Sequence, residues 1–306
     1  MERIRIKQID AFTSVPFQGN PAGVVTDAGQ LTDQEMQHIA REMNVSETAF
    51  IQPVGEDEWG DLRLRWFTPT QEVDLCGHAT IAAFYALAEE GKYGISPDTP
   101  EAFGIQTRSG QLTVELNWAE LRPYIHFDLP LPIFTQLDNR EFDCTAPFNK
   151  PDLIPDDRAP LVRDQNGYLY LLLSSREQLE ELEPDIRQFK QLYQEHGITA
   201  IAAVVLNASP SGKQDDHHEW YSRFFAPQLG VAEDPVTGSA NGPTALWLME
   251  AGLLGRETVR GKQGNPTGRQ GYVDVLTSWD GDQLNRLTIA GTACTVLDGT
   301  IVLGQQ

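Results

Sequence analysis

Two segments of the chain join a glycine to the start of a predicted helix, and their backbone groups could bind an anion. The segments are Cys76-Gly77-His78-Ala79-Thr80-Ile81 and Thr237-Gly238-Ser239-Ala240-Asn241-Gly242. The first N–H groups of a helix lack partners within the helix, and the helix dipole adds about half a positive charge there. Glycine lets a ligand approach the backbone closely, so a carboxylate or phosphate fits this chemistry. For one segment alone, an ordinary helix start remains an equally good interpretation.

The two segments are parts of an internal repeat. The strand end Trp66-Phe67-Thr68-Pro69 precedes the first segment, and Phe224-Phe225-Ala226-Pro227 precedes the second. The copies are about 160 residues apart, a spacing that indicates two duplicated lobes rather than a solenoid of short repeats. If a pseudo-twofold axis relates the lobes, both helix starts are expected to face one cleft, which favours the anion-binding interpretation.

Hydrophobic patterns predict the elements that position these segments. A helix is expected from Thr32 to Met43, because Thr32 with Glu35 has the spacing of a capping box. The helix that starts near Gly77 is apolar on nearly all sides and should be buried until it ends at Gly91. Its counterpart is expected at 239–251. Strands are predicted at 4–14, 24–25, 48–52, 62–67, 103–107, 111–117, 124–129, 201–207, 220–225, 258–260, 272–276, 286–289 and 295–303, with an exposed acidic helical segment at 176–195 broken at Pro184.

Length and charge define the broad class of protein. The chain has 306 residues, enough for two lobes, which we place at 1–130 and 131–306 with a crossing at Pro130-Leu131-Pro132. The last strand could return to the first lobe. The net charge of −21 argues against nucleic acid and against an anionic membrane surface. Because no signal-peptide pattern or apolar run of about 18 residues is present, we expect a cytoplasmic protein.

Cysteine and histidine spacing predicts neither disulfides nor a metal site. The three cysteines, Cys76, Cys144 and Cys294, are scattered and form no Cys-x-x-Cys pair. The pair His217-His218, beside Asp215 and Asp216, is typical of a solvated loop. The glycine-rich segment 261–269 lacks the order of a phosphate-binding loop and precedes no helix, so we interpret it as a hairpin connection.

Four motifs in order resemble the PhzF-like family, the phenazine-biosynthesis isomerases, whose fold resembles that of diaminopimelate epimerase. The motifs are Gly19-Asn20-Pro21-Ala22-Gly23-Val24-Val25, Ser46-Glu47-Thr48-Ala49-Phe50, Asp74-Leu75-Cys76-Gly77-His78-Ala79-Thr80 and Glu233-Asp234-Pro235-Val236-Thr237-Gly238-Ser239-Ala240. The resemblance implies an α+β fold of two similar lobes, each a curled sheet or barrel around a central helix. It also implies a cofactor-free site for a small carboxylate substrate, and a homodimer.

The resemblance also implies roles for individual residues. Glu47 is expected to move a proton as general acid and base, with His78 and Asp234 as its catalytic partners. Substrate binding is expected from Asn20, Gly77, Gly238 and Ser239, the glycines through their backbone N–H groups. On its own chemistry each residue also has an ordinary interpretation: Glu47 as an edge glutamate, Asp234 as a turn residue, and His78 and Ser239 as residues of a helix start.

Cys76 separates two chemistries. An epimerase of the diaminopimelate type uses one thiol from each lobe, but the position equivalent to Cys76 is Thr237. A threonine hydroxyl is too weakly acidic to replace a thiol, so a single-base isomerase is favoured over an epimerase or racemase, and Cys76 is interpreted as a packing residue. A catalytically silent protein that binds small anions on the same fold is the other alternative.

Overall fold

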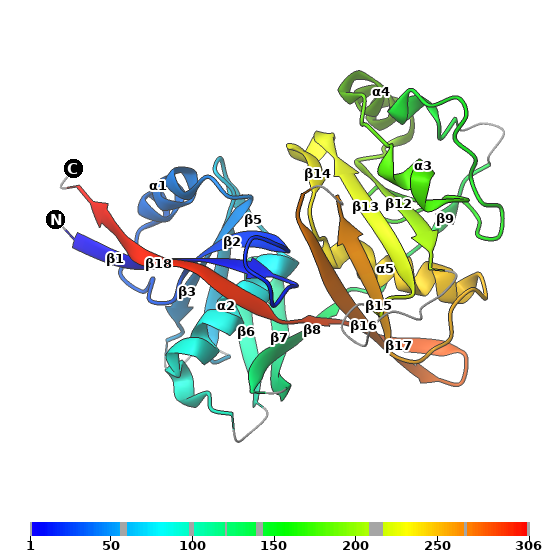
Figure 1. The fold of residues 1–306 in the computed structure, drawn as a ribbon. Coiled ribbons are helices and arrows are strands. Elements are labelled where there is room, and N and C mark those ends of the chain that lie inside the picture. The colour runs from blue at the N-terminus through cyan, green and yellow to red at the C-terminus, as the bar shows by residue number, and fades with distance from the viewer. Residues whose placement is uncertain are drawn as a thin grey trace. The chain divides into compact units, whose positions relative to one another are not determined.

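The computed structural model describes residues 2–55, 60–97, 101–119, 121–138, 143–207, 217–265 and 268–304. The chain forms two compact units, the first from Met1–Asp128 with Ala290–Gln306 and the second from Leu129–Ile289 (Figure 1). The returning C-terminal strand therefore belongs to the first unit. Within the described ranges, no helix is both long and apolar enough to span a membrane.

Strands surround one long helix in the first unit. Its elements are β1 (Glu2–Ala11), β2 (Asn20–Val25), α1 (Asp33–Met43), β3 (Glu47–Pro53), β4 (Leu62–Phe67), β5 (Glu72–Val73), α2 (Gly77–Glu90), a 3-10 turn (Lys92–Gly94), β6 (Glu101–Thr107), β7 (Gly110–Ala119), β8 (Arg122–Leu129) and β18 (Ala293–Leu303). The capping box predicted at Thr32 is confirmed, since the Thr32 hydroxyl accepts from the Glu35 N–H and the Glu35 carboxylate accepts from the Thr32 N–H. The first strand ends at Ala11, earlier than predicted, because Phe12 has a left-handed φ of 65°.

The second unit has the same plan, but two helices instead of one connect its first pair of parallel strands. Its elements are β9 (Thr135–Gln136), a 3-10 turn (Ala146–Phe148), β10 (Val162–Arg163), β11 (Tyr168–Leu172), α3 (Arg176–Glu180), α4 (Ile186–His196), β12 (Ala200–Leu206), β13 (Trp220–Ala226), a 3-10 turn (Pro227–Leu229), β14 (Val231–Asp234), α5 (Gly238–Glu250), β15 (Val259–Gly264), β16 (Gln270–Asp280) and β17 (Gln283–Gly291). The acidic segment is indeed two helices, α3 and α4, with Pro184 between them.

Strand pairing confirms the duplication. In the first unit β2 and β3 are parallel, β3 and β4 antiparallel, β4 pairs with β5 and runs parallel to β6, and β6 pairs antiparallel with β7. The second unit repeats this order with β11, β12, β13, β14, β15 and β16. The predicted α+β class, with similar lobes built around central helices, is confirmed by this shared topology.

The central helices are buried because they are apolar on every side. Ten of the 14 residues of α2 are buried, and α5 is buried throughout most of its length. Helix α2 packs against β1, β2 and β3, whereas α5 packs against β15 and β16. A Cβ atom at Gly242 of α5 would lie 2.6 Å from Cδ1 of Leu129, so glycine permits this close approach of helix and strand.

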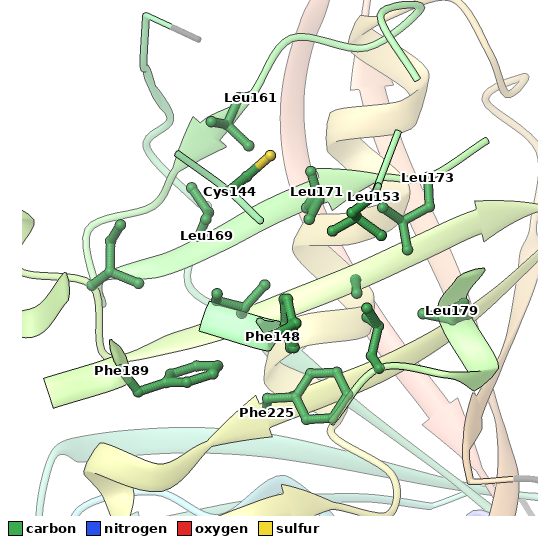
Figure 2. Packing of buried hydrophobic residues seen from close by; sticks show 14 of the residues in the cluster. Cys144, Phe148, Leu153, Leu161, Leu169, Leu171, Leu173, Leu179, Phe189 and Phe225 are labelled. Carbon is green, nitrogen blue, oxygen red and sulfur yellow. The ribbon is translucent and has the colours of Figure 1, made fainter. Parts of the chain in front are cut away.

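The second unit has a separate hydrophobic core that includes several aromatic side chains (Figure 2). The ring of Phe148 contacts those of Phe189 and Phe225, at centroid distances of 5.8 and 5.1 Å and in edge-on geometry. These contacts attach α4 to the sheet. Cys144 lies in the same core, where burial raises the pKa of its thiol to about 11 and so keeps it protonated and unreactive.

A buried charge cluster attaches the C-terminal end of α2 to β1. The ammonium of Lys7, whose side chain is 3% exposed, lies 2.5 Å from Oε2 of Glu89 and 3.2 Å from Oε1 of Glu90. The carboxylate of Glu90 also accepts from the Thr26 hydroxyl at 2.8 Å. Although burial opposes ionisation, the hydrogen bonds from Thr26 and Lys7 hold the pKa of Glu90 below its ordinary 4.5. Glu90 therefore stabilises the folded state while it is ionised.

We predict that Lys7→Met lowers the free energy of unfolding near neutral pH by about 3 kcal/mol, because it removes the buried ion-pair partner of Glu90 and leaves the more exposed Lys92 and Arg5. Glu90 has a lowered pKa in the fold, so its contribution is complete above pH 4.5 and is lost as the pH falls through the lowered value. Urea unfolding should therefore show a weaker loss of stability in acid for Lys7→Met than for the wild type. Arg187→Met, which removes a largely exposed side chain of the second unit 3.9 Å from Asp185, is the control and should have a much smaller effect. Equal losses in the two variants would contradict the assignment.

Candidate functional site

Glu47 and His78 come from neighbouring elements of the first unit and meet. Glu47 is the first residue of β3, opposite Ala22 in the parallel pairing with β2, and His78 is the second residue of α2. The extended Cys76 is the N-cap residue of that helix. Because the N-terminus of α2 starts beside the first residue of β3, the two side chains are brought into contact.

The carboxylate and the imidazole are 3.3 Å apart, measured from Oε2 of Glu47 to Nε2 of His78. The same ring nitrogen lies 3.3 Å from the Ser46 hydroxyl. The other ring nitrogen, Nδ1, lies 3.4 Å from the Cys76 sulfur. His78 therefore links the Ser-Glu-Thr segment to the Cys-Gly-His segment, which are separate motifs in the sequence.

The environment of Glu47 favours a carboxyl group that can hold a proton. Its side chain is 20% exposed, and that of His78 is 8% exposed. Burial raises the pKa of Glu47 above its ordinary 4.5, and hydrogen bonds with Ser46 and Cys76 oppose this increase. A carboxyl group with a raised pKa that still reaches the surface is suited to accepting and returning a proton near neutral pH.

Cys76 is more than the packing residue expected from the sequence. It is buried, but its sulfur contacts His78 and its thiol hydrogen-bonds with Glu47. One ligand atom from each of Glu47, Cys76 and His78 lies within 4.8 Å of the others, so these three side chains could hold a metal ion. Spacing did not predict this group, because Glu47 lies on a different element from the other two.

The other first-unit residues predicted to bind substrate lie on the same two elements or next to them. Asn20 is the first residue of β2 and is fully buried. Gly77 is the first residue of α2, where the backbone N–H groups of the first turn have no partners within the helix. The binding roles of both residues stay predictions.

The predicted residues of the second unit lie along a single loop and helix start. Asp234 ends β14, and its Oδ2 accepts from the Thr237 hydroxyl at 2.5 Å. Gly238 and Ser239 are the first two residues of α5, one position earlier than the predicted start. Because Thr237 is the N-cap residue and its hydroxyl is bound to Asp234, it has the position of Cys76 but not its chemistry.

Gln263 stabilises this loop through hydrogen bonds, a role that its position in the sequence did not indicate. Its side-chain amide donates to the Asp234 carbonyl at 2.9 Å and to the Thr237 hydroxyl at 3.0 Å. Its Oε1 accepts from the Thr237 N–H at 3.0 Å and from Asn241 at 2.6 Å. Asn241 in turn accepts from the indole N–H of Trp220 at 3.2 Å. The network fixes the backbone that carries Asp234 and starts α5.

The segment that contains Gln263 had been interpreted as a hairpin connection. The antiparallel pairing of β15 with β16 confirms the hairpin, but residues up to Gly264 belong to β15 itself. The parallel pairing of Ser222 with Gln263 brings this strand to β13 and so to the loop. The local order Gly261-Lys262-Gln263-Gly264 contains no signal for this pairing.

The adjacent residues His217 and His218 do not both follow the prediction of a solvated loop. His218 is buried rather than solvated, and Asn207 donates to its backbone carbonyl at 3.0 Å. His217 is half exposed and lies 2.7 Å from the Glu219 carboxylate. Asp215 and Asp216, which completed the predicted loop, lie outside the described residues.

Comparisons with known proteins cover the whole chain. The family described as phenazine biosynthesis-like protein, PhzC-PhzF, matches residues 9–299. The uncharacterized isomerase YddE of Salmonella typhimurium is 32% identical over 303 residues, covering 94% of this chain and 95% of its own. The trans-2,3-dihydro-3-hydroxyanthranilate isomerase of Pseudomonas chlororaphis is 33% identical over 301 residues, covering 96% and 98%. The crystal structure of a PhzF-family protein from Bacillus anthracis covers 99% of this chain and all of its own, with 29% identity and a TM-score of 0.84.

We predict that Gln263→Leu loosens the start of α5. The change leaves the Thr237 N–H without its acceptor and the Asp234 carbonyl without a donor, which should cost about 2–4 kcal/mol of stability. Hydrogen exchange followed by NMR should show faster exchange of the Thr237 amide. Gln270→Leu is the matched control, because that glutamine donates to the Tyr221 hydroxyl instead. Unchanged exchange of the Thr237 amide in Gln263→Leu would show that the network does not hold the loop.

Proposed function

Because the chain belongs to the PhzC-PhzF family of phenazine biosynthesis-like proteins, we propose that it is an isomerase that moves a proton within a small carboxylate-bearing substrate. Glu47 is the general acid and base. As a carboxylate it takes a proton from a C–H group, the C–H electron pair forms a new double bond to the neighbouring carbon, and the electron pair of the existing double bond shifts to the far carbon. The same carboxyl group returns the proton to another carbon, so the substrate changes its bonding but not its composition and no cofactor is consumed.

The placement of Glu47 is the observation that carries this proposal. Its carboxyl group is desolvated enough to hold a proton but remains partly exposed, and it lies 3.3 Å from an imidazole. His78 could orient the carboxylate and donate to a substrate oxygen. A proton shift between carbon atoms requires a base that is held in position, and the raised pKa of Glu47 helps it to keep the proton between the two steps.

Binding of the substrate is assigned to the remaining predicted residues. The N–H groups at Gly77 and Gly238 offer partial positive charge for a carboxylate without any lysine or arginine. This suits a chain with a net charge of −21. Asn20, Asp234 and Ser239 complete the proposed set, with Asp234 able to accept from a hydroxyl or an amine. The homodimer expected from the resemblance belongs to the same proposal.

The first compound to test is the substrate named for the relative from Pseudomonas chlororaphis. Trans-2,3-dihydro-3-hydroxyanthranilate is a cyclic, unsaturated carboxylate with an amine and a hydroxyl group, so it has every feature that the proposed site addresses. A panel of related cyclic and open-chain hydroxy and amino carboxylates should be screened with it, in deuterated water and by NMR. A silent anion-binding protein would bind such compounds without any isomerisation.

We predict that Glu47→Gln folds like the wild type but lowers turnover by about 10²–10⁴-fold, because the amide cannot accept the proton. Circular dichroism and thermal unfolding should establish that the fold is intact, and NMR of the substrate panel should measure turnover. The control Glu42→Gln changes an exposed glutamate of α1 and should leave turnover unaltered. Turnover by Glu47→Gln at the rate of the wild type would remove Glu47 from the mechanism.

We predict that Cys76→Ser retains at least a tenth of the turnover of the wild type, because in our account the thiol is only a neighbour of the base. In a two-thiol epimerase the same change should abolish the reaction. Thr237 supports the first outcome, since its hydroxyl already donates to Asp234 and has no thiol acidity. Chiral chromatography of amino acid carboxylates should be run with both proteins. Epimerisation that is lost with Cys76 would establish the alternative.

A further inference from the structure

The side chains of Glu47, Cys76 and His78 are three different kinds of metal ligand in mutual contact. A carboxylate, a thiolate and an imidazole are the donors that Zn²⁺ takes in proteins. From this arrangement we propose that Glu47, Cys76 and His78 form a binding site for Zn²⁺, which competes with proton transfer at Glu47.

Distances support three-ligand binding. In a tetrahedral zinc site with bonds of about 2.0 Å to N and O and 2.3 Å to S, ligand atoms lie about 3.3–3.6 Å apart. The sulfur of Cys76 is 3.4 Å from Nδ1 of His78, and Oε2 of Glu47 is 3.3 Å from Nε2. Only one ring nitrogen can coordinate, and the three ligand atoms lie within 4.8 Å of one another. Tetrahedral binding therefore requires side-chain shifts of up to about 1.5 Å, which bring the sulfur and the carboxylate to the same ring nitrogen.

Burial and charge support the choice of cation. Cys76 and His78 are both buried, whereas Glu47 reaches the surface and gives the ion a route of entry. A divalent cation would offset the cost of desolvating the Glu47 carboxylate. The thiol would release its proton to solvent on binding, and a water molecule would occupy the fourth position. Mg²⁺ should not bind, because it prefers six oxygen ligands.

Zinc binding can be tested without any substrate. Tag-free protein, stripped with a chelator and checked for folding by circular dichroism, is titrated with Zn²⁺ in competition with a colorimetric chelator. We expect the wild type to bind one ion per chain. Cys76→Ser and His78→Asn should each weaken binding at least about tenfold, because even the loss of a residue behind a ligand costs that much. Cys144→Ser and Cys294→Ser are matched controls and should bind as the wild type does.

Cobalt provides a second measurement, because its spectrum reports a thiolate ligand directly in the wild type. Co²⁺ bound to the wild type should show a thiolate-to-metal charge-transfer band, absent in Cys76→Ser and kept in Cys144→Ser. His217→Asn should leave binding unaltered, which excludes the half-exposed His217 beside Glu219 as the ligand. The site is disproved if the wild type binds no Zn²⁺, or if Cys76→Ser binds it as tightly as the cysteine controls do.

Inhibition rests on the proposed function and is measured separately. Zn²⁺ should suppress turnover over the same concentrations at which it binds, and addition of a chelator should restore it. If zinc binds but no isomerase activity exists, the proposed function fails and the metal site stands. If turnover is measured and zinc at saturating concentration leaves it unchanged, competition at Glu47 is wrong while the proposed function stands.

Discussion

A helix that is apolar on all sides is stable in water only when strands enclose it, and this constraint shapes both units. Helices α2 and α5 have no polar face to expose, so each sheet must curl around its helix. The ends of such a helix are different from its sides, because the first turn has backbone N–H groups that need partners. Polar chemistry is therefore concentrated where α2 and α5 begin.

The duplicated topology gives the two helix starts the same surroundings but different side chains. In the first unit the N-cap residue is Cys76, and the Thr80 hydroxyl donates to its carbonyl at 2.7 Å. In the second unit the N-cap residue is Thr237, and Asn241 donates to its carbonyl at 3.0 Å. The backbone arrangement is thus retained, while only the first copy has a carboxyl group, an imidazole and a thiol in contact.

Local signals in the sequence predicted local structure well. The capping box at Thr32 and the stop at Gly91 depend on residues within one or two turns, so their positions followed from spacing alone. The repeat predicted the shared topology, because two copies of one pattern must fold in one way. The contact of Glu47 with His78 could be expected from the resemblance only, since the packing of α2 against β3 decides it.

Contacts between distant segments could not be predicted. Gln263 looked like part of a connection, and its role depends on the pairing of β15 with β13. Cys76 was interpreted as packing because its counterpart in the repeat, Thr237, is not a thiol, and no rule of spacing links Cys76 to Glu47. Lys7, an ordinary residue in a first strand, proved to be buried against Glu89 and Glu90. In each case the missing information is which strand lies beside which, and this is a property of the whole sheet.

The central claim is that the Glu47 carboxyl group carries the proton, and a primary kinetic isotope effect tests it most directly. Turnover of the substrate found in the carboxylate screen, with hydrogen or deuterium at the carbon that loses its proton, should be compared in the wild type and Glu47→Asp. The shorter side chain withdraws the carboxylate from the carbon, so proton transfer should become slower and the isotope effect larger. The same rate and the same isotope effect in both proteins would contradict the account.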